Sequence, residues 1–93
     1  MSERKDVLSS DIRLRVCAAL YGVNRSKFSD IKESLGVTDS SLSKCLRSLE
    51  EADYVTIVKR RTGRSYETIV SLTGYGIAEY ESHRRYIRDI LNL

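Results

Sequence analysis

Apolar residues along this chain change their spacing from three or four positions to two and back again, which predicts helices on both sides of a β-hairpin. The first helical stretch carries the apolar residues Ile12, Val16, Ala19 and Leu20. Ser9 or Ser10 has a side-chain oxygen that can cap the first turn, and Gly22 is a favoured place for the helix to end. Residues 23–27 are mostly polar and predict an irregular connection.

Two short helices joined by a tight turn are predicted next. Ser29 is the expected cap of the first of them, and Gly36 ends it. Thr38 then caps a helix over about residues 39–52. Its apolar face is formed by Leu42, Cys45, Leu46 and Leu49. A helix, a glycine-containing turn and a second helix in this order form the helix-turn-helix pattern.

A strand-like pattern follows the third helix. Residues 54–59 (YVTIVK) and 66–72 (YETIVSL) are rich in β-branched residues and predict two strands. Between them, residues 61–65 (RTGRS) contain a glycine suited to a hairpin turn. Thr73 can cap a long last helix over about residues 74–91.

These elements fit one small domain over residues 1–93, of α+β class and mainly helical: a three-helix core, a β-hairpin and a long C-terminal helix. The formal net charge is only +3, so the position of the charges matters more than their sum. No stretch approaches the roughly 18 apolar residues of a membrane span, and the N-terminus has no apolar signal core. We therefore expect a cytoplasmic protein that does not bind membranes.

The helix over 39–52 has a polar face opposite its leucines, since about 100° separates successive residues. Serine is a mediocre helix former, so a serine-rich helix needs a further reason, and close approach to a DNA groove supplies one. Hydroxyl and cationic side chains hydrogen-bond base edges and phosphates. The alternative is an ordinary solvated face. The expected DNA-binding residues around this helix are Thr38, Ser40, Ser41, Ser43, Lys44 and Arg47.

The predicted hairpin carries a second group of cations. Its expected DNA-binding residues are Lys59, Arg60, Arg61 and Arg64. No acidic residue interrupts residues 59–64, and arginines at a hairpin tip suit phosphates or a narrow minor groove. The alternative is an edge ribbon that charge keeps soluble. Because the cationic hairpin follows the serine-rich helix, contact with DNA is the favoured interpretation.

The last helix is too long to be buried wholly by so small a domain. Apolar or long side chains recur along it at steps of 3, 4, 3 and 4, the spacing of a coiled-coil seam: Ile77, Tyr80, Arg84, Ile87 and Leu91. We expect its N-terminal part to pack within the chain and its C-terminal part to form a homodimer interface. Arg84 then needs a carboxylate, such as Glu81 or Asp89, or must reach water.

Few residues offer chemistry beyond binding. Cys17 and Cys45 fall at apolar helical positions and predict buried, reduced thiols, with a redox switch as the alternative. The single histidine, His83, lacks the spaced partners of a metal site. We find no glycine-rich phosphate loop and no nucleophile–base pair. We therefore expect no catalytic residue, metal or cofactor, and no enzymatic activity.

The segment LGVTDSSLSKCLRSLEEADYV (35–55) and the LTGYG that opens the last helix (72–76) resemble the small winged helix-turn-helix regulators grouped with the MarR and ArsR families. The order of elements matches over nearly the whole chain. The resemblance implies a sequence-specific regulator of transcription that binds double-stranded DNA. The helix over 39–52 would enter the major groove, the hairpin over 59–66 would touch the backbone or minor groove, and the end helices would form a dimer.

The chain departs from this family pattern at three points, one of which is Gly74, where proline often begins the last helix. Asp53 stands where such proteins usually have glycine after the recognition helix, and aspartate tolerates a left-handed backbone better than most residues. The cysteine-pair motif of metal-sensing members is absent. The sequence does not identify the operator or an effector. The competing interpretation is a winged-helix protein-interaction or RNA-binding module without DNA sequence specificity, but two polar or basic surfaces favour duplex DNA.

Overall fold

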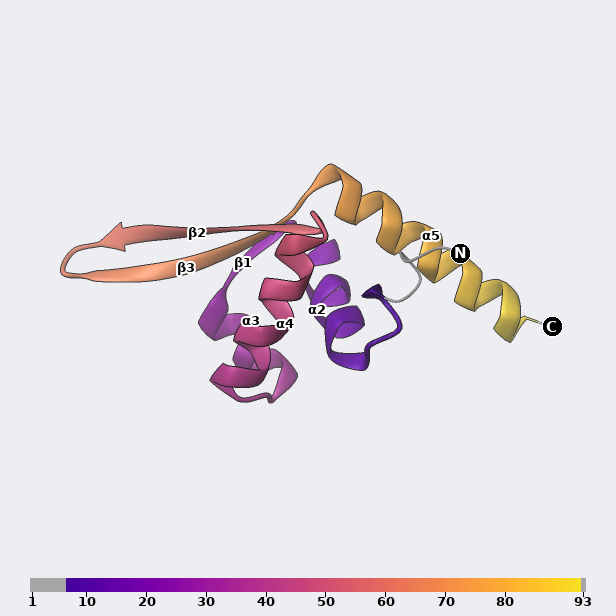
Figure 1. Ribbon diagram of the computed structural model, residues 1–93, viewed down its shortest axis with the longest axis horizontal. Helices are drawn as coiled ribbons and strands as arrows, with labels where there is room; N and C mark the ends of the chain where they lie inside the picture. The colour runs from indigo at the N-terminus through magenta and orange to yellow at the C-terminus, as the bar shows by residue number, and fades with distance from the viewer. Residues whose placement is uncertain (1–6, 93) are drawn as a thin grey trace.

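The computed structural model describes residues 7–92, in which a helical body carries a long β-hairpin on one side and a long helix on the other (Figure 1). The molecule extends 53 Å along its longest axis and 23 Å across. The elements in chain order are α2 (Asp11–Tyr21), β1 (Arg25–Lys27), α3 (Phe28–Leu35), α4 (Asp39–Glu51), β2 (Val55–Thr62), β3 (Ser65–Leu72) and α5 (Gly74–Leu91). The predicted order of three helices, hairpin and last helix is confirmed. No helix within the described residues is long and apolar enough to cross a membrane.

Local capping signals set most of the helix boundaries. Ser10, Thr38 and Thr73 each accept a hydrogen bond from the backbone N–H three residues later, which confirms three of the four predicted caps. Gly36 ends α3 in the left-handed conformation, with φ of 67°. Asp53 also has a left-handed φ of 67°, so the aspartate after α4 adopts the backbone conformation that the family usually assigns to glycine.

Two predictions for residues 23–29 are wrong. Residues 25–27 form the strand β1 rather than an irregular connection, and β1 pairs with β3 in a sheet of order β1-β3-β2. The helix α3 begins at Phe28, with Lys27 at the cap position, so Ser29 is not the cap. The physical reason is tertiary: pairing of Lys27 with Ile69 keeps the backbone extended up to the first helical residue.

The hairpin is longer than its predicted strands. β2 and β3 pair from Val55 opposite Leu72 to Thr62 opposite Ser65, so the turn consists of residues 63 and 64 only. Gly63 has a positive φ of 61°, which a two-residue hairpin turn requires at its first position. β1 pairs only as far as Lys27, so the outer part of the hairpin is a two-stranded ribbon.

The core lies between α2, α3, α4 and the base of the sheet. All four residues predicted for the apolar face of α4 are buried, and the largest fully buried side chain is Tyr54. Cys17 and Cys45 are buried free thiols, as expected. Burial raises the pKa of Cys17 to about 12 and that of Cys45 to about 11, so both remain protonated near neutral pH. A protonated, buried thiol is typical of a structural cysteine rather than a reactive one.

The helix α5 packs on the body through its N-terminal half. The Tyr80 ring lies 4.9 Å from the Tyr21 ring, and the Tyr21 hydroxyl donates to the Glu81 carboxylate at 2.5 Å. Arg84 lies over the Tyr21 ring at 5.1 Å, so its guanidinium contacts an aromatic face in its own chain. Tyr80 is the last buried residue of α5 within the described chain. The C-terminal half of α5 projects away from the body (Figure 1).

Candidate nucleic-acid interface

The predicted DNA-binding residues at α4 all lie on the surface. Thr38, Ser40, Ser41, Ser43, Lys44 and Arg47 are exposed, while the apolar side of the same helix is buried. The Thr38 oxygen accepts the Ser41 N–H at 3.1 Å, so part of its hydrogen-bonding capacity serves the cap. The helical period therefore predicts correctly which residues of α4 a partner could reach.

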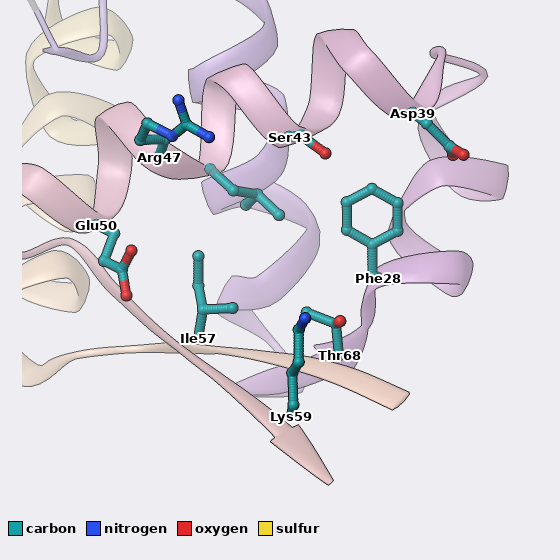
Figure 2. A pocket seen from close by; sticks show the side chains of 9 residues that line it. Phe28, Asp39, Ser43, Arg47, Glu50, Ile57, Lys59 and Thr68 are labelled. Carbon is teal, nitrogen blue, oxygen red and sulfur yellow. The ribbon is translucent and has the colours of Figure 1, made fainter. Parts of the chain in front are cut away.

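These residues do not form one uniform patch. Ser43 and Arg47 line a groove of about 520 Å³ between α4 and the sheet, together with Ile57, Lys59 and Thr68 (Figure 2). Ser41 and Lys44 line a smaller hollow on the opposite flank of α4, beside Arg13 of α2. Arg47 and Lys59 therefore lie in one groove, whereas Lys44 lies on the other side of the helix.

Acidic side chains in the same groove were missed by the sequence analysis. Asp39 and Glu50 line it with Arg47, and Figure 2 shows Glu50 and Arg47 on successive turns of α4. Asp39 also pairs with Lys32 of α3 at 2.9 Å. The spacing of three between Arg47 and Glu50 could have revealed the second carboxylate, because residues three apart share a helix face. The groove is mixed in charge, so it offers both hydrogen-bond donors and acceptors to a ligand.

The hairpin cations are divided between two faces, because successive side chains of a strand point to opposite sides. Lys59 lines the groove beside α4, and Arg61 follows on the same face of β2. Arg60 lies on the other face, opposite Glu67 of β3. The structure therefore brings Lys59 and Arg61 to the α4 side of the sheet and separates Arg60 from them.

Glu67 binds two of the nearby cations. Its carboxylate lies 2.7 Å from the Arg60 guanidinium and 3.3 Å from the Lys27 ammonium. These contacts, first that of Arg60 and then that of Lys27, lower the pKa of the Glu67 carboxyl. A two-residue turn at 63 and 64 places Glu67 opposite Arg60, so a correct turn assignment would have revealed this partner from the sequence.

The tip of the hairpin keeps its remaining arginines at the surface. Arg64 is exposed in the turn itself. The Arg61 Nε donates to the Gly63 carbonyl at 3.3 Å, and its guanidinium lies 6.0 Å from the centre of the exposed Tyr66 ring. Tyr66 was not among the predicted site residues, although its place beside the turn could have suggested it. The tip thus presents two cations and an aromatic ring.

Solved structures share this arrangement of helices and hairpin. A transcriptional regulator homologue from Pyrococcus horikoshii OT3 matches with a TM-score of 0.82 and 27% identity, over 95% of this chain and 90% of that chain. Reduced AbfR bound to DNA matches with a TM-score of 0.68 and 18% identity, over 96% of this chain and 75% of that chain. A mutant of MepR from a multidrug resistant S. aureus clinical isolate matches with a TM-score of 0.77 and 19% identity, over 97% of this chain and 68% of that chain. AbfR and MepR are MarR-family regulators, and at these identities the likeness concerns the fold.

Sequence comparison gives the family. An uncharacterized protein from Methanocaldococcus jannaschii is 32% identical over 87 residues, which cover 94% of this chain and 91% of that protein. The family model for the winged helix DNA-binding domain matches residues 12–91, a range that includes α4, the hairpin and α5. The chain belongs to the winged helix DNA-binding domain family.

Proposed function

We propose that this chain is a cytoplasmic, homodimeric regulator of transcription that binds double-stranded DNA at a specific sequence. The helix α4 enters the major groove, and the hairpin of residues 55–72, the wing, lies on the backbone or minor groove. The observation that carries the proposal is the shared groove, which is lined by Arg47 of α4 and by Lys59 of the wing. AbfR, which has the same fold, has been solved bound to DNA, and this supports DNA as the ligand.

Selection from a random duplex pool tests the function directly. The purified full chain should enrich a sequence motif with two-fold symmetry, because a symmetric dimer reads two equivalent half-sites. The same protein should bind single-stranded RNA of matched length more weakly. Equal retention of all duplexes without enrichment, or stronger retention of RNA, would favour the RNA-binding or protein-interaction module instead.

The wing should supply sequence-independent affinity. Replacing Arg61 and Arg64 with alanine should lower the slope of log affinity against log salt by about 0.9 for each phosphate that the wing no longer binds. Both side chains are exposed at the hairpin tip, so the fold should be unaffected. The slope is measured by titrating a labelled duplex at several salt concentrations. Arg85→Ala/Arg88→Ala, which removes two exposed cations from α5, is the charge-matched control. A wing variant with the slope of the control would place the tip away from DNA.

The C-terminal half of α5 supports the homodimer. Ile90 and Leu91 are exposed, Leu91 by 77%, and Tyr86 lies beside them. Within the predicted seam, Tyr80 is buried in its own chain, so the part open to a partner lies after Arg84. A helix end with this much exposed apolar surface is stabilised when a second copy covers it.

Light scattering at micromolar concentration should show a dimer that becomes monomeric in Ile90→Asp/Leu91→Asp. Both side chains are exposed in the single chain, so two carboxylates there should spare the fold and disrupt only an interface. Arg85→Ala, also exposed on α5, should remain dimeric. A monomeric wild-type protein would exclude the dimer, and a dimeric double variant would place the interface elsewhere.

A further inference from the structure

Glu67 connects all three strands of the sheet. It lies on β3, the central strand, and is the only acidic residue among residues 55–72 of the wing. One carboxylate oxygen binds Arg60 of β2 at 2.7 Å, and the other binds Lys27 of β1 at 3.3 Å. A single carboxylate thus engages one cation from each neighbouring strand.

The bridge lies where the sheet narrows. β1 reaches only Lys27, which pairs with Ile69, and Glu67 is two residues further along β3 towards the tip. The Glu67 side chain is 23% exposed, whereas those of Arg60 and Lys27 are 58% and 48% exposed. Both cations can therefore reach solvent. Strand alternation sets the face from which each side chain leaves the sheet, and the carboxylate sets where its charged end lies on that face.

The bridge has an effect beyond folding stability. Ion pairs between exposed side chains contribute little to folding, because water and salt screen them. The bridge does change the charge that the wing presents to a partner, since Glu67 offsets one of the two cations and holds both against the sheet. This effect matters for a protein whose partner is a polyanion.

We propose that Glu67 is a specificity-determining residue of the DNA interface, which holds Arg60 and Lys27 away from DNA phosphates. Phosphate contacts strengthen binding to every sequence alike, whereas discrimination comes from base edges. Because Glu67 keeps two cations from binding phosphates, the affinity for random DNA stays low. The ratio of operator affinity to random-DNA affinity therefore stays high. This inference rests on the proposed function, in which the wing lies on the DNA backbone.

Glu67→Gln tests the proposal with little change in shape, because glutamine keeps the length and one acceptor oxygen but carries no charge. The slope of log affinity against log salt should become steeper by about 0.9 for each released cation that reaches a phosphate. Binding to random duplex should tighten severalfold, and the ratio of operator to random affinity should fall by a similar factor. Circular dichroism before and after heating checks that the variant folds.

Two comparisons separate this effect from a general gain of positive charge. Glu33→Gln makes the same replacement at an exposed residue of α3, outside the proposed DNA and dimer surfaces, and should leave the salt slope unchanged. In a Lys27→Gln/Arg60→Gln background, Glu67→Gln should also change nothing, because the cations that it would release are absent. An equal effect in that background, or no effect of Glu67→Gln in the wild-type protein, would overturn the inference.

The wild-type measurement distinguishes failure of this inference from failure of the proposed function. A wild-type protein that does not bind duplex, or binds without salt dependence, contradicts the proposed function and the role of Glu67 together. A wild-type protein that binds an operator with a clear salt slope, together with a Glu67→Gln variant that behaves identically, contradicts only the role of Glu67.

Discussion

Gly76→Ala should destabilise the protein by about 2–3 kcal/mol, the cost of forcing an atom into a packed contact. A Cβ at Gly76 would lie 2.1 Å from the Tyr54 carbonyl oxygen and 2.9 Å from its carbonyl carbon. This carbonyl cannot retreat easily, because it accepts the Thr73 N–H at 3.0 Å and the Thr73 hydroxyl at 3.2 Å. Alanine favours a helix over glycine by only about 1 kcal/mol, which does not offset this steric cost.

Gly74→Ala is the matched control for this prediction. Gly74 belongs to the same helix, and no atom lies within 4 Å of a Cβ placed there. Its replacement should stabilise the protein by up to about 1 kcal/mol. Urea unfolding of both variants measures the difference. A Gly76→Ala protein as stable as the Gly74→Ala protein would show that α5 does not pack this closely on Tyr54.

Arg47→Ala should weaken binding to the selected operator by about 1–3 kcal/mol, the usual discrimination of an arginine that contacts a base edge. Arg47 is exposed on α4 and lines the groove that faces Lys59 of the wing. A duplex in that groove would bring base edges to its guanidinium. Affinity for random duplex should change much less, because base readout operates only on the correct sequence.

Lys44→Ala provides the informative comparison, because Lys44 lies on the opposite flank of α4, beside Arg13. Base contact by Lys44 would lower operator affinity alone, whereas phosphate contact would lower operator and random affinity alike. Fluorescence anisotropy at one salt concentration, with Arg85→Ala as the control for removal of a positive charge, measures all variants. Unchanged operator affinity in both Arg47→Ala and Lys44→Ala would remove α4 from the DNA interface.

Features governed by neighbouring residues in the chain could be predicted from the sequence. Thr38 and Thr73 cap their helices because each side-chain oxygen meets an N–H only three residues later. The spacing of leucines on α4 identified its buried face for a similar reason. β1 could not be found in this way, since the residues Arg25, Ser26 and Lys27 form a strand only because β3 lies beside them.

In the candidate site, too, some features follow from the local sequence and others depend on tertiary packing. The exposure of Lys44 and Arg47 follows from the helical period, but their separation onto two flanks depends on where α2 and the sheet pack. The cations of the hairpin appear as one cluster in the sequence. The period of two along a strand separates Arg60 from Lys59 and Arg61, but its partner Glu67 can be assigned only when the two-residue turn fixes the register.

The attachment of α5 has a consequence for how far apart two DNA sites can lie. In the proposed dimer, the chains meet near Leu91, while α4 reads DNA from the body on the other side of Tyr21. The Tyr21 contacts with Tyr80, Glu81 and Arg84 fix the direction in which α5 leaves the body. From Glu81 to Leu91 the helix spans about 15 Å, so a small rotation at Tyr21 displaces the partner's reading helix by several ångströms. In that proposed dimer, the spacing between operator half-sites is therefore set at a junction that touches neither the DNA nor the second chain.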